Sequence, residues 1–179
     1  LSPHLRKYQK EIVNKALNEG CYGIFSDTGT GKTVMGLEIA THYKKTLILC
    51  PLSVIETAWI DDCNKFYPNT KIINVWSNSK QNRIKLLNTS ADIYVMNYES
   101  FKILKNEIRN ADFECLIVDE SSVMKNMTSQ ITNDILETID YIPHRFVLSG
   151  TPTPNHNSEI FPQMKLVDKE IFGNNYYGF

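Results

Sequence analysis

A glycine-rich segment early in the chain reads Ser26-Asp27-Thr28-Gly29-Thr30-Gly31-Lys32-Thr33. An apolar run, residues 21–25, precedes it and an amphipathic stretch begins at Lys32, so the pattern predicts a strand, a loop and a helix. In such a loop the backbone N–H groups turn toward an anion, and the N-terminus of the helix favours negative charge. Lys32 adds a cation, and Thr33 offers a hydroxyl to Mg²⁺. The segment therefore predicts a cradle for the phosphates of a nucleotide, formed by Thr28, Gly29, Thr30, Gly31, Lys32 and Thr33.

The match to the full phosphate-loop pattern G-x-x-x-x-G-K-[ST] is limited to its second half. Ser26 occupies the position of the first glycine, so only the G-K-T end is present. The alternative interpretation is a glycine-rich turn that happens to precede a helix. The strand before the loop and the Lys32-Thr33 pair favour the phosphate site.

Length and composition are those of one ordinary globular domain. The chain has 179 residues, of which 42% are hydrophobic and 22% charged, enough for a single core of good size. The formal net charge is −1, so any contact with a polyanion must come from local clusters. The cysteines lie at least thirteen positions apart, which excludes a C-x-x-C metal pair and predicts reduced thiols. No apolar run approaches about 18 residues, so we expect no membrane segment and a location in the cytoplasm, or in the nucleus of a eukaryote.

Apolar runs and amphipathic stretches alternate along the whole chain. Such alternation predicts an α/β fold with a central, mostly parallel sheet, helices on both faces and ligands at the carboxyl ends of the strands. The predicted strands are residues 21–25, 46–50, 72–76, 93–96, 115–120 and 145–148. The predicted helices are residues 5–19, a stretch from Lys32, 53–66, 80–87, 101–108 and a stretch capped by Thr128.

Residues 53–66 carry a signal for the start of a helix. Ser53 is the expected N-cap, and Glu56 three residues later completes a capping box. Capping alone explains Ser53, although an exposed helix start is also a natural site for a nucleic acid phosphate. Trp59 lies within the apolar stripe of this helix, which favours packing in the core over stacking on a base.

Two adjacent carboxylates, Asp119 and Glu120, end the near-continuous apolar run that begins at Cys115. Charges at the end of a buried strand are costly unless a cation meets them. Downstream of a phosphate loop, Asp119 is predicted to hold Mg²⁺, through water, and Glu120 to orient and deprotonate the attacking water. The alternative is an acidic strand end that faces solvent.

Small polar residues follow two other predicted strands. Asn97 and Tyr98 follow the run 93–96, and Ser149-Gly150-Thr151 follows the run 145–148. Hydroxyls beside the carboxylates could pass the state of the γ-phosphate to a neighbouring surface. Simple turn chemistry is the alternative in both places.

Taken together, these motifs resemble superfamily-two helicases, and more closely the Snf-type, chromatin-remodeller-like translocases. The likeness runs from Leu5 to Gly173, and its motifs occur in the family's order. They are Leu-Arg-x-Tyr-Gln at 5–9, Gly-Thr-Gly-Lys-Thr at 29–33, Leu-Cys-Pro-Leu-Ser-Val at 49–54 with Trp59, Asn-Tyr-Glu at 97–99, Val-Asp-Glu at 118–120 with Lys125-Asn126, and Ser-Gly-Thr-Pro at 149–152 with Asn155.

The resemblance implies a RecA-like P-loop NTPase fold, with residues 1–179 as the first, ATP-binding domain. It also implies ATP and Mg²⁺ as ligands, and DNA, as a duplex, as the partner. The second RecA-like domain and its arginine are expected in a longer enzyme from which this chain is a fragment, so the chain alone is expected to be nearly inactive. Arg145 is not expected to replace that arginine, because it begins a strand whose other end lies at the phosphates.

The resemblance further assigns individual residues. Taken by itself Gln9 would be a surface glutamine, but the resemblance makes it the adenine reader, since its amide can donate and accept. Lys32 and Thr33 bind phosphate and Mg²⁺, and Asp119 and Glu120 drive hydrolysis. The implied coupling residues are Ser149, Gly150 and Thr151. The implied contacts to nucleic acid are Ser53, Asn97, Tyr98 and Lys125.

One departure from the family lies next to the acidic pair. Ser121-Ser122 stands where the family has Ala-His or Ala-Asp, and serine has a shorter reach than histidine. Three other functions stay open: the motor of a restriction or repair ATPase, a strand-separating helicase, and a nucleotide-gated binding module. A small-molecule kinase is disfavoured because no segment resembles a lid over an acceptor substrate.

Overall fold

The computed structural model describes residues 1–27, 29–124, 129–138, 140–150, 159–168 and 170. Within these residues one six-stranded sheet has the order β1-β6-β5-β2-β4-β3, and every pair of neighbours is parallel. The predicted α/β fold with a parallel sheet is therefore confirmed. The strands are β1 (Cys21–Phe25), β2 (Thr46–Leu49), β3 (Ile72–Asn74), β4 (Ile93–Met96), β5 (Cys115–Asp119) and β6 (His144–Ser149).

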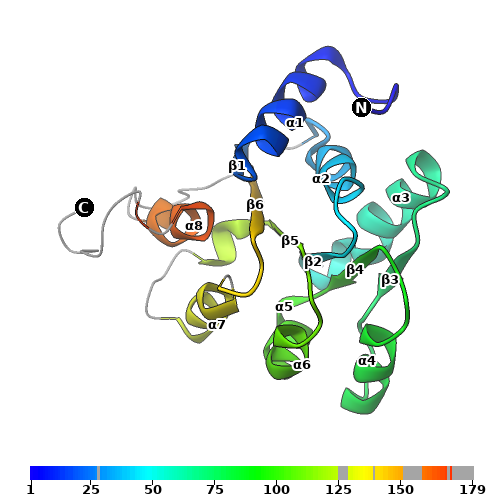
Figure 1. Ribbon diagram of the computed structural model, residues 1–179, viewed down its shortest axis with the longest axis vertical. Helices are drawn as coiled ribbons and strands as arrows, with labels where there is room; N and C mark the ends of the chain where they lie inside the picture. The colour runs from blue at the N-terminus through cyan, green and yellow to red at the C-terminus, as the bar shows by residue number, and fades with distance from the viewer. Residues whose placement is uncertain (28, 125–128, 139, 151–158, 169, 171–179) are drawn as a thin grey trace.

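Helices cover both faces of the sheet (Figure 1). One face carries α1 (Lys7–Glu19), α2 (Lys32–Ala40) and α3 (Asp61–Phe66). The other carries α4 (Lys80–Leu87), α5 (Tyr98–Ile103), α6 (Lys105–Arg109), α7 (Gln130–Thr138) and α8 (Ile160–Val167). Three short helical segments complete the described fold: the 3₁₀ turn η1 (Leu52–Val54), the π-helix η2 (Ile55–Ile60) and the 3₁₀ turn η3 (Ser121–Met124). No helix in the described part of the chain is long and apolar enough to cross a bilayer.

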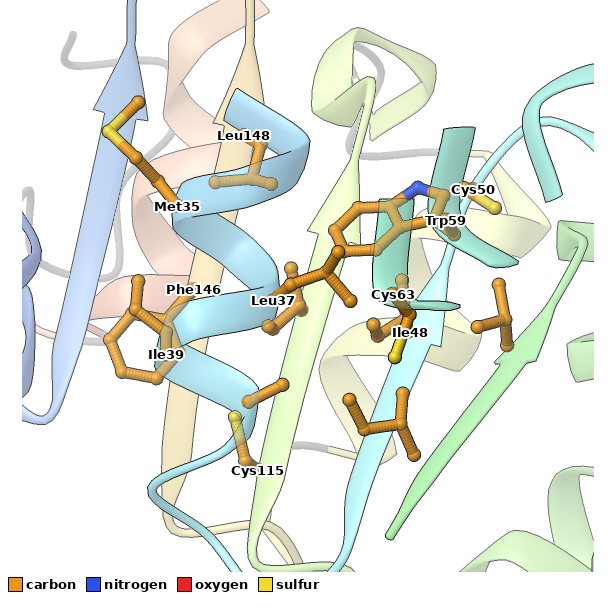
Figure 2. Packing of buried hydrophobic residues seen from close by; sticks show 14 of the residues in the cluster. Met35, Leu37, Ile39, Ile48, Cys50, Trp59, Cys63, Cys115, Phe146 and Leu148 are labelled. Carbon is orange, nitrogen blue, oxygen red and sulfur yellow. The ribbon is translucent and has the colours of Figure 1, made fainter. Parts of the chain in front are cut away.

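Two hydrophobic clusters fill the space between the sheet and its helices. Successive residues of a strand point to opposite faces, so Ile48 and Cys50 belong to one cluster whereas Leu47 and Leu49 belong to the other. Figure 2 shows the first cluster, which lies between the sheet and α2. Trp59 is fully buried in it, as the apolar stripe predicts.

The start of the helix predicted over residues 53–66 differs from expectation. Ser53 is not an N-cap, because it lies inside a 3₁₀ turn. The Val54 amide donates to the Pro51 carbonyl, 3.1 Å, and this bond closes the turn. Glu56 does not complete a capping box either. Its carboxylate accepts a bond of 2.6 Å from the Asn74 side chain on β3, a tertiary contact that the local pattern does not contain.

Two other boundaries also shift. The helix predicted over 101–108 begins earlier, because the Asn97 side chain accepts the Ser100 amide as an N-cap, and it divides into α5 and α6 at Leu104. The predicted cap Thr128 lies outside the described residues, and the Ser129 hydroxyl accepts the Thr132 amide at the start of α7.

Arg145 lies where its position in the sequence predicts, at the edge of the sheet opposite the phosphate loop. In the parallel pair of β1 and β6, Arg145 is the partner of Cys21 at the start of β1. Its guanidinium donates to the Leu166 carbonyl at the end of α8, 2.7 Å, and to the Ile142 carbonyl, 3.2 Å. This side chain therefore fastens α8 to the start of β6.

Gly36 is the point where α2 lies closest to Trp59. A Cβ atom at Gly36 would stand 2.7 Å from the Cη2 atom of Trp59 and 3.1 Å from the Cδ1 atom of Leu148. Overpacking of this kind costs ~1–3 kcal/mol, and the better helix propensity of alanine returns ~0.5–1 kcal/mol. We expect Gly36→Ala to lower the free energy of unfolding by ~1–2 kcal/mol in urea denaturation.

A second substitution, at Trp59, tests whether this clash causes the loss of stability. Trp59→Phe removes the outer ring that the new methyl group would meet, so Gly36→Ala should cost clearly less in that background than in the wild-type protein. Equal costs in both backgrounds would show that the contact with Trp59 does not limit this position.

Candidate nucleotide site

Three groups of predicted site residues, as far as the structure describes them, lie at the carboxyl ends of three neighbouring strands. Phe25 at the end of β1 is the partner of Ser149 at the end of β6, and Asp119 on β5 is the partner of Leu148 on β6. The sheet order therefore places the phosphate loop, the Ser149-Gly150 turn and the Asp119-Glu120 pair next to one another. They surround a pocket of about 390 Å³, lined by Gly29, Gly31, Lys32, Thr33, Val54, Asp62, Asp119, Glu120 and Gly150.

This pocket is not the largest hollow of the described residues. A hollow of about 600 Å³ lies beside Lys45 and Tyr94, with residues that precede strands at the amino-terminal edge of the sheet. The smaller pocket is the candidate nucleotide site because the phosphate loop and the carboxylates line it, and ligands of parallel α/β folds bind at the carboxyl ends of strands.

Side chains within the phosphate loop hold its shape. The Thr30 hydroxyl donates to the Asp27 carbonyl, 2.8 Å, and lies 2.8 Å from the Ser26 hydroxyl. The Lys32 ammonium donates to the carbonyls of Ser26, 2.7 Å, and Asp27, 2.9 Å. Ser26, which replaces the first glycine of the usual pattern, thus contributes a hydroxyl that links the two ends of the loop.

Gln9 connects α1 to this loop. Its Oε1 atom accepts the Arg6 amide at 2.8 Å, and its Nε2 atom donates to the Thr30 carbonyl at 2.9 Å. Gly31 has a φ of 81°, a conformation that favours glycine, and a Cβ atom there would meet that Nε2 atom, so any side chain at this position would also displace the Gln9 amide. The Tyr8 hydroxyl donates to the same carbonyl, 2.8 Å. Gln9 is therefore a part of the loop's support, and its contact with adenine stays a prediction.

Asp119 is held from three directions. Its Oδ2 atom accepts the Trp59 indole N–H at 3.0 Å, and its Oδ1 atom accepts the Glu120 amide at 2.9 Å. The Tyr98 hydroxyl donates to the Asp119 carbonyl. Burial raises the pKa of Asp119, while the bonds from Trp59 and from the Glu120 amide act in the opposite direction. Burial and the nearby Asp119 charge raise the pKa of Tyr98 well above its usual value, so this phenol stays a donor.

Glu120 occupies a backbone conformation that is uncommon for a residue with a side chain. Its φ is 55°, in the left-handed region. Such conformations cost of order 1–3 kcal/mol and gather at functional sites. Here the turn follows directly after the buried strand and places Glu120 on the pocket that Lys32 and Thr33 also line.

The donor set suits one hydrated Mg²⁺ ion. Mg²⁺ keeps several waters and is bound through one or two carboxylates together with substrate phosphates. Thr33 and Asp119 line the pocket together and supply one hydroxyl and one carboxylate. Within the described ranges no group of three His, Cys, Asp or Glu side chains could hold a metal ion by itself, so a dry protein cage is not formed there.

Sequence reasoning missed two polar side chains of the site. Trp59 was assigned to the core alone, yet its N–H reaches Asp119. Asp62 lines the pocket, and burial raises its pKa. Asp62 follows Trp59 by three positions, so both lie on one side of the helical segment, and this spacing was the available signal.

The remaining predicted residues are placed as follows. The Asn97 side chain is buried, and its Oδ1 atom accepts the Ser100 amide and hydroxyl, 3.1 and 2.6 Å. Ser149 is buried and its carbonyl accepts the Ser26 amide, 3.2 Å. Contacts of Ser53, Asn97 and Tyr98 with nucleic acid stay predictions. Thr28, Lys125 and Thr151 lie outside the described residues.

Comparison with known proteins connects this geometry to one family. The family model described as "SNF2-related domain" matches residues 8–177. A Caenorhabditis elegans protein, "SWI/SNF-related matrix-associated actin-dependent regulator of chromatin subfamily A-like protein 1 homolog", is 32% identical over 178 residues, which cover 97% of this chain. The "DNA annealing helicase and endonuclease ZRANB3" of Bos taurus is 28% identical over 180 residues, again 97% of this chain.

A solved structure has the same fold. The structure "Sulfolobus solfataricus SWI2/SNF2 ATPase core in complex with dsDNA" superposes with a TM-score of 0.83 at 21% identity and covers 98% of this chain. The chain matches 38% of that structure, 26% of the nematode protein and 17% of the bovine protein, so it spans only part of each of them.

Proposed function

This chain belongs to the family of SNF2-related domains, and we propose that it is the ATP-binding half of an ATP-dependent motor that moves along duplex DNA. Membership of this family supports an ATPase. The observation on which the proposal rests is the set of residues that line the candidate site. Lys32 and Thr33 of the phosphate loop line one pocket together with Asp119 and Glu120. Two similar proteins have names that refer to chromatin and DNA, and the similar solved structure contains duplex DNA.

Each side chain has a defined role in hydrolysis under this proposal. The loop amides and the Lys32 ammonium bind the β- and γ-phosphates. Thr33 and Asp119 would hold Mg²⁺, and the ion would supply positive charge to the phosphate oxygens as negative charge develops on them. Glu120 accepts a proton from the water that attacks the γ-phosphorus, while the bond from that phosphorus to the β-γ bridging oxygen breaks.

A second RecA-like domain of the same protein is the proposed partner across the cleft. It supplies an arginine to the transferred phosphate and grips DNA together with this domain. Ser149, Gly150 and Thr151 then relay the state of the phosphate, since the Ser149 carbonyl is bonded to the Ser26 amide at the start of the phosphate loop. The proposed location is wherever cellular DNA lies, the cytoplasm or, in a eukaryote, the nucleus.

The direct test is steady-state ATP hydrolysis by the full-length protein with and without duplex DNA. We expect turnover that needs Mg²⁺ and rises on addition of duplex DNA. Displacement of a third strand from a triplex then measures movement, and release of one strand from the duplex measures unwinding. ATP binding without sustained turnover would contradict the motor and favour the nucleotide-gated binding module.

A further inference from the structure

Two side chains from distant parts of the chain meet at Asp119. The Trp59 indole donates to its carboxylate at 3.0 Å, across 60 positions of sequence, and the Tyr98 hydroxyl donates to its carbonyl, across 21. Trp59 belongs to the helical segment that follows β2, and Tyr98 is the first residue of α5, directly after β4 and Asn97. Both strands lie on the same side of β5 in the sheet. Asp119 is thus held from the half of the sheet that does not carry the phosphate loop.

The indole of Trp59 has little freedom to move away from this contact. It is fully buried, and Gly36 on α2 leaves no room on one side of its outer ring. Figure 2 shows the indole between α2 and the residues after β2, with its nitrogen on the side of Cys50. Trp59 also lies in a π-helix, a rare element that occurs mostly as single turns within α-helices and frequently at functional sites. The tight packing holds the N–H in its direction toward Asp119.

The carboxylate retains acceptor sites for the metal. Each carboxylate oxygen offers about two lone pairs. On Asp119 the indole occupies one on Oδ2, and the Glu120 amide occupies one on Oδ1. As far as the described residues go, one position on each oxygen is therefore left for waters of a hydrated ion, and the indole and the Glu120 amide determine in which directions those positions point.

We propose that Trp59 and Tyr98 are positioning residues that orient Asp119 for Mg²⁺. This inference rests on the proposed function, because it assumes that the pocket binds a magnesium nucleotide. Neither side chain touches the reacting atoms. Both donors come from the segments that carry the predicted DNA contacts Ser53 and Asn97, so the same hydrogen bonds join those segments to Asp119, one at its carboxylate and one at its carbonyl.

The test compares Trp59→Phe with Trp76→Phe in the full-length protein. Phenylalanine keeps an aromatic ring in the core at position 59 but removes the N–H. Trp76 is partly exposed and follows β3, so its replacement is a matched control. ADP affinity is measured by isothermal titration calorimetry, once with Mg²⁺ and once with EDTA, and the Mg²⁺ concentration for half-maximal ATP hydrolysis is measured separately.

Loss of a residue that orients a metal ligand typically costs 10–100-fold in metal affinity or activity. We expect Trp59→Phe to weaken ADP binding about tenfold with Mg²⁺ and to leave the metal-free affinity unchanged. The Mg²⁺ requirement of hydrolysis should rise by a similar factor. Trp76→Phe should match the wild type. A purely structural role for Trp59 would instead weaken both ADP measurements equally, and that result would overturn the inference.

Tyr98→Phe is the second variant, because it removes one hydroxyl and leaves the ring in place. It should also weaken ADP binding in the presence of Mg²⁺ and leave ADP binding in EDTA unchanged. If Trp59→Phe does not fold, Tyr98→Phe alone tests the proposal. The double variant should lose less than the product of the two single losses, since both donors act on one residue, Trp59 on the Asp119 carboxylate and Tyr98 on its carbonyl. The proposal would be refuted if each single variant, Tyr98→Phe and Trp59→Phe, bound ADP in the presence of Mg²⁺ as tightly as the wild type does. Failure of the wild-type protein to bind Mg·ADP would instead refute the nucleotide site itself.

Discussion

Glu120→Gln in the full-length protein is expected to keep ATP bound while lowering turnover by about 10²–10⁴. Glutamine has the shape of glutamate and can still orient a water molecule, but its amide cannot take the proton. The backbone turn at Glu120, with φ at 55°, should be unaffected because the amide N–H that bonds Asp119 remains. ATP affinity by calorimetry and single-turnover hydrolysis with rapid quenching separate binding from chemistry.

Glu19→Gln is the matched control. It makes the same chemical change at an exposed carboxylate at the end of α1, beside the amino-terminal edge of the sheet, and should leave both measurements unchanged. Turnover of Glu120→Gln within a factor of a few of wild type would mean that another group accepts the proton.

Lys32→Ala is expected to reduce nucleotide affinity by roughly ten- to 150-fold, because a charge-assisted contact of ~1.5–3 kcal/mol is lost. An ammonium group has three donors. Two of these donors bond the carbonyls of Ser26 and Asp27. The third N–H can therefore bind a phosphate oxygen while both loop bonds are kept. The alanine variant loses that contact and the two bonds that hold the loop closed.

Because Lys32 also supports the loop, the fold of the variant must be checked by circular dichroism and urea denaturation. Lys44→Ala serves as the control, since it removes an exposed lysine just before β2, at the opposite edge of the sheet. Unchanged ATP affinity in a correctly folded Lys32→Ala protein would disprove the phosphate cradle.

Local patterns were enough to locate most elements. A short apolar run of four to six residues, bounded by turn residues and rich in β-branched side chains, favours a buried strand over a helix. All six predicted strands exist, although several end one or two residues earlier than expected. Helix starts were less certain. Ser53 matches a capping box, but the turn that begins at Pro51 and the contact from Asn74 to Glu56 override that local preference.

The sequence by itself determined the α/β class, the phosphate loop and the acidic pair after β5, because each depends on neighbouring residues and on periodicities of two and 3.6. Tertiary structure alone decided the sheet order, and this order brings Lys32 and Glu120 into the lining of one pocket. It also decided that Trp59 and Tyr98 reach Asp119 and that Gln9 supports the phosphate loop. Such contacts join residues 21 to 60 positions apart. Their partners are chosen by how helices pack on the sheet, and no local pattern records that choice.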